Sequence, residues 1–206
     1  MSIVEISIED YKQEFETSKN KEKLGEVNTD FQLIINMLEI IPKSKFTNPD
    51  LKWLDPCCGR GYFMIVLFHK LYKSLEEKIP NDIQRKKHII EKMLYMVEIN
   101  VEHISKLKEI FGKDANIFNI DFLNFKSDNF DIIIGNPPYN INGLKKVPTN
   151  NKLNKLKDGK TIWPNFIKKA VSLLKKNGNM VMIIPSIWMR PDRAKMYNFL
   201  LQYKYL

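Results

Sequence analysis

The chain has 206 residues, of which 44% are hydrophobic, so it is long enough for one domain with a sizeable core, or for one domain and part of another. This composition excludes a disordered chain, and no apolar run is long enough to cross a membrane. The formal net charge of +9 favours a polyanionic partner, although surface lysines alone also produce such a value.

The predicted elements begin after a charged, weakly periodic arm over residues 1–23. Thr29 and Gln32 have the spacing of a capping box, which predicts the start of a helix, and Pro42 ends that helix. An apolar stripe is expected to face inward, formed by Phe31, Leu33, Ile34, Met37, Leu38 and Ile41.

Three strands and two helices are expected in the middle of the chain. Residues 51–75 predict a short strand, a glycine turn and a helix. Residues 73–92 are polar and predict a surface excursion or an extra helical turn. A second strand is predicted over 93–100, a helix over 101–111 and a third strand over 116–121.

The fourth predicted strand, residues 130–135, contains a run of isoleucines with no polar face. Such a run indicates a strand buried on both sides, as in a parallel sheet. A stretch rich in lysine and asparagine, residues 141–160, separates this strand from the next helix. Its lysines could hold phosphates or simply face solvent; they are Lys145, Lys146, Lys152, Lys155, Lys157 and Lys160.

The last predicted elements are a helix, a strand and a helix. The helix over 161–176 is expected to end in a cationic turn followed by a glycine cap at Gly178. A fifth strand is predicted over 179–186 and a final amphipathic helix over 192–203. Strands that alternate with helices predict an α/β fold, a parallel sheet with right-handed crossovers.

Acidic residues are predicted to follow three successive strands, at the sheet edge where ligands bind in such folds. Asp55 ends the first strand and is followed by Gly59 and Gly61, which let the backbone turn tightly near a ligand. Glu98 ends the second strand and could bind two ribose hydroxyls, and Asp121 ends the third and could meet an adenine edge. A glycine turn alone is weak evidence, but three acids favour a nucleotide site.

The fourth strand ends in the sequence Asn136-Pro137-Pro138-Tyr139. The residue before a proline avoids the α region, and a proline has a fixed φ and no N–H to donate. We therefore expect Asn136 and Pro137 to be extended beyond the strand, with an amide and a carbonyl beside an aromatic ring.

At this point the chain resembles the S-adenosylmethionine-dependent N6-adenine DNA methyltransferases in which the cofactor motif precedes an Asn-Pro-Pro-Tyr motif, as in Eco57I-like (type IIG) and TaqI-like enzymes. The resemblance runs from about Leu24 onward. It rests on GEVNTD at 25–30, where Asp30 replaces the family's proline, on DPCCGRGYF at 55–63, and on Glu98, Asp121-Phe122 and NPPY.

The resemblance implies a class I, Rossmann-like methyltransferase domain over residues 24–206, with a mostly parallel sheet and helices on both faces. S-adenosylmethionine would be held by Thr29, Asp55, Pro56, Gly59, Gly61, Phe63, Glu98, Ile99, Asp121, Phe122 and Asn136. Methyl transfer would be carried by Asn136, Pro137, Pro138 and Tyr139.

The residues of the proline corner suit the methylation of an aromatic amine, whose lone pair is delocalised into its ring. If Asn136 Oδ1 and the Pro137 carbonyl accept hydrogen bonds from the amino group, they stabilise the positive charge that develops on nitrogen. Tyr139 would stack on an adenine that has flipped out of the duplex.

Three alternatives to DNA adenine methylation stay open: methylation of an RNA base, methylation of a protein glutamine amide, and a non-catalytic subunit that binds the cofactor. The chain carries no predicted sixth or seventh strand and no target-recognition domain. We therefore expect a fragment, or a partner chain that completes the sheet and reads the DNA sequence. Without one, the fifth strand would be an exposed edge.

The cysteines and histidines predict neither a disulfide nor a metal site. Cys57 and Cys58 are adjacent in sequence and are expected to be small loop residues rather than nucleophiles. His69, His88 and His103 lack the spacing of metal ligands. With no signal-peptide pattern, we expect a soluble intracellular protein, in the cytoplasm, nucleoid or nucleus.

Overall fold

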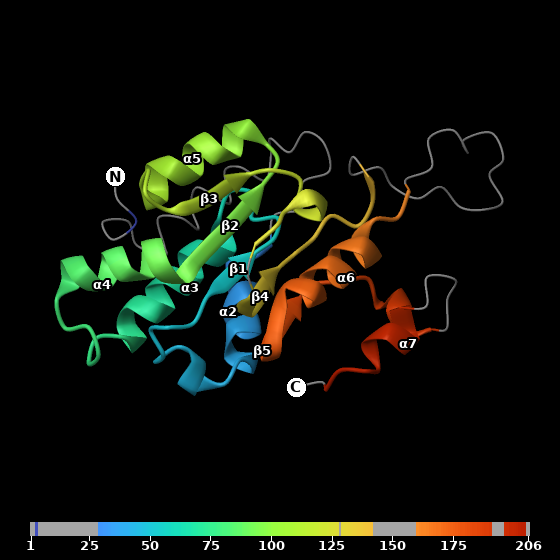
Figure 1. Ribbon diagram of the computed structural model, residues 1–206, viewed down its shortest axis with the longest axis horizontal. Helices are drawn as coiled ribbons and strands as arrows, with labels where there is room; N and C mark the ends of the chain where they lie inside the picture. Colours follow the sequence, from blue (N-terminus) through green and yellow to red (C-terminus); the bar gives the residue numbers. More distant parts are fainter. Residues whose placement is uncertain (1–2, 4–28, 128, 142–159, 191–195, 205–206) are drawn as a thin grey trace.

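The computed structural model describes residue 3 and residues 29–127, 129–141, 160–190 and 196–204 (Figure 1). Most of the predicted arm, the lysines of the 141–160 stretch other than Lys160, and the start of the predicted last helix lie outside the described residues. None of the described helices is both long and apolar enough to span a bilayer.

Five parallel strands form a single sheet in the order β3-β2-β1-β4-β5. Their bounds are β1 Trp53–Asp55, β2 Leu94–Glu98, β3 Asn116–Asn119, β4 Phe130–Gly135 and β5 Leu174–Met182. The chain adds β2 and β3 on one side of β1, then returns to place β4 on the other side. Ligands bind at such a switch point in open α/β sheets. The predicted parallel α/β architecture is confirmed.

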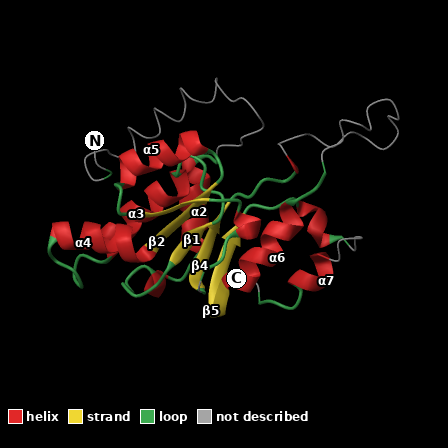
Figure 2. Ribbon diagram, turned by 45° about the horizontal axis from the view of Figure 1, so that its top comes forward, coloured by secondary structure: helices red, strands yellow, loops and turns green. Residues whose placement is uncertain are grey.

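Helices cover both faces of the sheet, as predicted. The helices are α2 Phe31–Ile40, α3 Tyr62–Ser74, α4 Asp82–His88, α5 Val101–Phe111, α6 Trp163–Leu173 and α7 Met196–Leu200. Figure 2 shows α3 and α5 on one side of the strands and α6 and α7 on the other. One large core lies between the sheet and α2, α3 and α5, and a second core, rich in phenylalanine, lies under α6.

The isoleucine run of β4 joins these two cores. Ile132, Ile133 and Ile134 are fully buried, with Ile132 and Ile134 in the first core and Ile133 in the second. Alternate side chains of a strand point to opposite faces, so a strand covered on both faces is apolar throughout. The prediction of a strand buried on both sides is therefore confirmed.

The start of α2 differs from the predicted capping box. Asp30, not Thr29, caps the helix, because Asp30 Oδ1 accepts hydrogen bonds from the N–H groups of Gln32 and Leu33. Leu33 was expected to face inward but is 45% exposed, whereas the rest of the predicted stripe is buried. The helix ends before Pro42, as predicted.

The boundary between α6 and β5 was also predicted wrongly. The helix ends at Leu173, and the cationic segment expected to be its last turn belongs to β5, where Leu174 pairs with Phe130. Lys175 Nζ lies 2.8 Å from Asp131 Oδ2, an ion pair that fixes this segment against β4. The left-handed residue is Asn177, with φ 63°, not the predicted cap Gly178.

Smaller differences concern the polar excursion and the third strand. Residues 73–92 contain the end of α3, the helix α4 and most of a π-helical turn, Ile89–Met93, in which Ile89 and Met93 are fully buried. The third strand ends at Asn119, and Asp121 instead caps a 3₁₀ turn, Phe122–Asn124, by accepting from Leu123 N–H.

Ile3, the one described residue of the predicted arm, lies in the large core. Its side chain is fully buried, and its N–H donates to the carbonyl of Ile110 in α5 over 3.2 Å. This hydrogen bond attaches Ile3 to α5, the helix that connects β2 to β3.

Gly61, the N-cap of α3, is needed for the close approach of α3 and α5. It has a φ of 86°, and a Cβ at this position would lie 2.6 Å from Leu107 Cδ2. We expect Gly61→Ala to lower the free energy of unfolding by about 3 kcal/mol, from a left-handed backbone plus overpacking. Gly59→Ala is the matched control, because its φ is 53° and nothing lies within 4 Å of where its Cβ would stand.

Urea unfolding of the two variants checks this prediction. The control should lose only the backbone contribution, about 1 kcal/mol. Equal losses in both variants would show that the contact with Leu107 is relieved without cost.

Candidate active site

The carboxyl ends of β1 and β4 place two predicted segments side by side. Leu54 pairs with Ile133, so Asp55 and the corner that follows Gly135 lie at the same edge of the sheet. A Cβ on Gly135 would lie 2.8 Å from Asp55 Oδ1 and 3.4 Å from Pro56 Cδ. Position 135 therefore requires a glycine, because β4 passes close to Asp55 and Pro56 there.

A cavity of about 60 Å³ lies where the glycine turn, the start of α2 and the proline corner meet. It is lined by Thr29, Cys57, Cys58, Gly59, Arg60, Tyr62, Phe63 and Asn136. Four of these are predicted site residues: Thr29, Gly59, Phe63 and Asn136. Segments more than a hundred residues apart in sequence are thus brought together as expected.

The side-chain amide of Asn136 has one partner on one side and none on the other. Its Nδ2 donates to Thr29 Oγ1 over 3.2 Å. Among the described residues, no donor reaches Asn136 Oδ1, although this atom is buried. A buried acceptor without a partner is costly, and such groups occur where a ligand supplies the missing donor.

The main chain of the proline corner is held from two sides. Cys57 Sγ donates to the carbonyl oxygen of Asn136 over 3.4 Å. The carbonyl of Tyr139 accepts from Ile162 N–H over 3.0 Å, which attaches the corner to the start of α6. Pro137 is buried and Pro138 is exposed.

The ring of Tyr139 lies at the surface, with 36% of the residue exposed. Partial burial raises the pKa of its phenol, so the ring is neutral at physiological pH. After Tyr139 the main chain pairs with the segment that precedes α6. An isolated β-bridge joins Asn140 to Thr161, and Ile141 N–H donates a hydrogen bond to the Lys160 carbonyl. The neutral ring therefore adjoins a stem of paired main chain, formed by Asn140, Ile141, Lys160 and Thr161.

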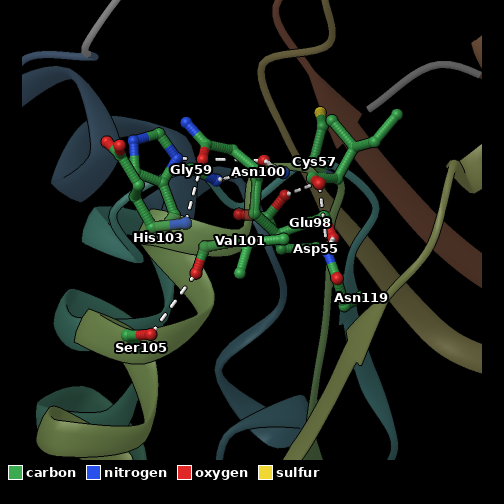
Figure 3. A network of polar contacts seen from close by, with 11 residues as sticks. Asp55, Cys57, Gly59, Glu98, Asn100, Val101, His103, Ser105 and Asn119 are labelled. Carbon is green, nitrogen blue, oxygen red and sulfur yellow. Dashed lines mark hydrogen bonds and ion pairs between the residues drawn. The ribbon is translucent and has the colours of Figure 1, made fainter.

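Glu98 organises the glycine turn (Figure 3). Its Oε2 accepts from Gly59 N–H and its Oε1 from Asn100 N–H, both over 2.7 Å. His103 is the third residue of α5, and its Nδ1 lies 3.8 Å from Glu98 Oε1. Each carboxylate oxygen has two lone pairs, so the predicted contact with ribose hydroxyls remains available to it.

The two neighbouring acids are held in different protonation states. Burial raises the pKa of Asp55 to about 8; the Cys57 N–H opposes this, and the negative charge of Glu98 adds to it. Burial alone would also raise the pKa of Glu98. However, contacts with His103 and the main-chain N–H groups of Asn100 and Gly59 outweigh burial and hold that pKa below its ordinary value. At neutral pH Glu98 is charged and Asp55 carries a proton.

Asp55 also has an unpartnered oxygen. Its Oδ1 accepts from Cys57 N–H over 3.1 Å, whereas the buried Oδ2 has no hydrogen-bond partner among the described residues. A buried carboxyl with one free oxygen is suited to a cationic or hydrogen-bonding group of a ligand.

The residues predicted to contact the adenine end of the cofactor are only partly exposed. Ile99 is 68% exposed beyond the end of β2, and Asn119 Nδ2 donates to the carbonyls of Glu98 and Ile99, both over 3.0 Å. Phe122 lies in the core, its ring centroid 5.5 Å from that of Phe166. Phe122, predicted as a cofactor contact, is therefore a core residue that is only 2% exposed.

A larger cavity, of about 210 Å³, lies between α3 and α5. It is lined by Arg60, Tyr62, Ile65, Glu102, His103, Lys106 and Ile110. It contains none of the predicted site residues, whereas four of them line the smaller cavity. In the described part of the chain, no group of three His, Cys, Asp or Glu residues is arranged to hold a metal.

A family model described as Eco57I restriction-modification methylase matches residues 28–206. The chain belongs to this family. It is 27% identical to an uncharacterised adenine-specific methylase of Mycoplasma pneumoniae, over 80% of this chain and 56% of that protein.

Solved structures show the same fold. A modification subunit of a putative type I restriction enzyme from Vibrio vulnificus matches with a TM-score of 0.64 and 19% identity, over 95% of this chain and 44% of that chain. A putative class I S-adenosylmethionine-dependent methyltransferase from Listeria monocytogenes matches with a TM-score of 0.60 and 17% identity, over 98% of this chain and 62% of that chain.

Both the predicted family and the predicted class I methyltransferase fold are therefore confirmed. This Eco57I-family chain spans about half the length of the Mycoplasma and Vibrio relatives.

Sequence reasoning missed five residues of the candidate site in this Eco57I-family chain. His103 lies beside Glu98, and the cavity is lined by Cys57, Cys58, Arg60 and Tyr62. These four lining residues lie within the predicted glycine turn, so proximity in sequence was an available signal. His103 follows Glu98 by five residues, but its orientation depends on how α5 leaves the strand, which the sequence pattern does not encode.

The thiol of Cys57 should be unreactive despite its position in the site. Burial, and then the charges of Asp55 and Glu98, raise the pKa of Cys57 and Cys58 well above the ordinary value. Because the thiolate is the nucleophile, we expect iodoacetamide at pH 7.5 to label the folded protein at least about tenfold more slowly than the chain in concentrated urea. Intact mass spectrometry measures both rates. Rapid labelling of the folded protein would contradict the raised pKa.

Proposed function

We propose that this chain transfers a methyl group from S-adenosylmethionine to the exocyclic N6 amino group of adenine in DNA. The observation that carries the proposal is the buried, unpartnered Oδ1 of Asn136 beside Pro137, at the carboxyl end of β4. No donor among the described residues reaches this acceptor, so it is available to a donor on a ligand.

The described residues fit S-adenosylmethionine. Gly59 and Gly61 have φ angles of 53° and 86°, and nothing lies within 4 Å of where a Cβ would stand on Gly59. The unpartnered Asp55 Oδ2 suits the positively charged methionine part, and Glu98 suits the ribose. Thr29, Phe63 and Ile99 would complete the contacts, with Asp121 at the adenine edge. When bound, S-adenosylmethionine supplies the methyl group.

The chain's own contribution is to position the amine and stabilise charge on it. Asn136 Oδ1 and the Pro137 carbonyl would accept hydrogen bonds from the two protons of N6. Nitrogen would form its bond to the methyl carbon as the bond between that carbon and the sulfonium sulfur breaks and the sulfur leaves as a neutral thioether. The positive charge would thereby pass to nitrogen, where these two acceptors would stabilise it. One N6 proton then leaves to solvent. No strong base is required before the attack.

Adenine would be held as a flipped base. Tyr139 offers a neutral, partly exposed ring on which the base can stack. Lys160, exposed at the base of the stem, would contact a backbone phosphate, as would the lysines of residues 145–157 that lie outside the described residues.

Labelled S-adenosylmethionine tests the proposal against its alternatives. Adenine-containing DNA, adenine-containing RNA and a glutamine peptide are offered in parallel, and the product is identified by mass spectrometry after hydrolysis. The matched control is DNA in which adenine is replaced by purine, which stacks and pairs poorly but lacks the amino group. We expect N6-methyladenine from DNA and no label in the control. Label in RNA or in the peptide alone would reject DNA as the substrate.

A further strand is proposed to pair with β5. In the described residues β5 pairs only with β4, and its residues from Gly178 to Met182 are half-buried. An apolar strand with a free hydrogen-bonding edge invites pairing. We propose that another segment or a partner chain covers this edge and supplies target recognition. A monodisperse, stable and fully active monomer of the 206-residue chain would contradict this.

A further inference from the structure

Arg60, between the two glycines of the turn, has a buried donor without a partner. Its side chain lines the smaller cavity together with Thr29 and Asn136, and it also lines the larger cavity. Its Nε is buried, and no acceptor among the described residues reaches it. The guanidinium group carries donors only, and its planarity fixes the direction of the Nε–H. A buried donor of this kind is costly, and such groups occur where a ligand supplies the missing acceptor.

Hydrogen bonds of the main chain hold Arg60 at a fixed place beside the smaller cavity. Gly61 N–H donates to the Cys58 carbonyl over 2.8 Å and closes a turn in which Arg60 is the third residue. Cys58 N–H donates to the Val97 carbonyl over 3.0 Å, which ties this turn to β2. The guanidinium is therefore presented from main chain that is already ordered, so less conformational freedom is lost when a ligand binds to it.

The larger cavity does not supply the missing acceptor. The one acidic residue of its lining is Glu102, in the first turn of α5. Glu102 is exposed, and no ion pair joins it to Arg60 in the described part of the chain. Lys106 adds a second positive charge to the same lining. The acceptor is therefore expected in the smaller cavity, which Arg60 also lines.

The sulfur of S-adenosylmethionine carries three substituents, and one of them belongs in the smaller cavity. In the proposed function the adenosine lies toward Glu98 and Asp121, and the methyl group faces Asn136. The third substituent, the amino acid part, is then left for the cavity that Thr29 and Arg60 line. It ends in an ammonium and a carboxylate on the same carbon, so it brings an acceptor of full negative charge into this cavity.

We propose that Arg60 binds the carboxylate of the methionine part of S-adenosylmethionine, while Asp55 binds its ammonium. An ionised carboxylate only accepts hydrogen bonds, so it completes the Nε–H group of Arg60, and the guanidinium fork can bind both of its oxygens. This assignment rests on the proposed function and adds a contact to it. The sequence pattern does not predict that contact, because it uses only the glycines on either side of Arg60.

Two ligands that differ only in the carboxylate test the assignment. S-adenosylhomocysteine is compared with its decarboxylated analogue, 5′-S-(3-aminopropyl)-5′-thioadenosine, which keeps the adenosine, the sulfur and the ammonium. Calorimetry with the full 206-residue chain, in the absence of DNA, gives the Kd of each ligand. We expect the wild type to bind S-adenosylhomocysteine at least about tenfold more tightly than the analogue, and Arg60→Met to bind the two within about twofold of each other.

Two further variants control for charge and for general effects of substitution. Arg60→Lys keeps the charge without the fork, so it should retain part of the preference for S-adenosylhomocysteine. Lys106→Met is the matched control, because Lys106 lines only the larger cavity, and its preference should equal that of the wild type. An unchanged preference in Arg60→Met, or an equal loss in Lys106→Met, would overturn the assignment. If circular dichroism shows that Arg60→Met does not fold, Arg60→Gln replaces it.

Because binding is measured without a methyl acceptor, the assignment and the proposed function can fail separately. A wild type that labels no substrate would reject DNA methylation by this chain. Loss of the ligand preference in Arg60→Met would still support the assignment of Arg60. Conversely, if the wild type methylates DNA and Arg60→Met keeps the preference, only the assignment of Arg60 is overturned.

Discussion

Replacing Asp55 with asparagine is expected to stabilise the folded protein at neutral pH and to weaken its binding of S-adenosylmethionine. The wild-type carboxyl is buried, and burial raises its pKa to about 8, with a smaller contribution from the charge of Glu98. Asparagine keeps the oxygen that accepts from Cys57 N–H and removes the group that must ionise. The Asp55 carboxyl is thus expected to lower the stability of the folded protein at neutral pH and to strengthen cofactor binding.

The direction of the pH effect follows from the two pKa values. In the unfolded chain Asp55 titrates near 3.8, whereas in the folded protein it does so near pH 8. Between these values the folded protein holds a proton that the unfolded chain has released, so stability falls as pH rises. Each unit of that shift corresponds to about 1.4 kcal/mol, and above pH 8 the loss is complete.

Urea unfolding at pH 5, 7 and 8.5 measures this effect. The advantage of Asp55→Asn over the wild type should increase from pH 5 to pH 8.5. Asp114→Asn, at an exposed position, controls for the removal of one acidic residue. A pH-independent difference between Asp55→Asn and the wild type would mean that the buried carboxyl is already ionised in the folded protein.

Cofactor binding should show the opposite dependence on pH. A positively charged ligand beside Asp55 Oδ2 favours the carboxylate, so binding should release a proton below pH 8. The affinity of the wild type for S-adenosylmethionine is therefore expected to rise from pH 6 to pH 8, and that of Asp55→Asn should be lower throughout. Calorimetry in buffers of different ionisation enthalpy measures the released proton directly. Equal affinities would remove Asp55 from the site.

The sheet and the position of the site could be predicted because they follow from local patterns. The isoleucines of β4 have no polar face, the glycine turn follows β1, and Asp55 and Glu98 end their strands. Parallel strands bring their carboxyl ends to one edge, so residues far apart in sequence were expected to converge. No local rule was overridden at these positions.

The misses occurred where a tertiary contact outweighed a local preference. The segment after Leu173 has a cationic helix end in its sequence, but the ion pair of Lys175 with Asp131 and the pairing of Leu174 with Phe130 make it a strand. Threonine is a residue type favoured at helix N-caps, but the hydroxyl of Thr29 contacts Asn136, and Asp30 caps α2 instead. A sequence pattern contains neither of these distant partners.

Replacing Asn136 with alanine is expected to lower kcat for DNA methylation by about 10²- to 10³-fold, the loss typical of removing one preorganised group that stabilises developing charge. The Pro137 carbonyl and the cofactor contacts remain, so residual activity above background is expected. The rates are measured in whichever form of the wild-type protein labels DNA. Asn124→Ala is the matched control, because Asn124 is exposed on the 3₁₀ turn and should leave kcat unchanged.

Stability distinguishes this role from a structural one. Alanine removes the buried, unpartnered Oδ1 together with the hydrogen bond of Nδ2 to Thr29, and these two effects on folding have opposite signs. The free energy of unfolding should therefore change by less than about 1 kcal/mol while kcat falls. A large loss of stability with kcat nearly unchanged would make Asn136 a packing residue of the proline corner. A large fall in kcat with little change in stability would mean that the fold keeps a buried acceptor without a partner because the substrate amine donates a hydrogen bond to it.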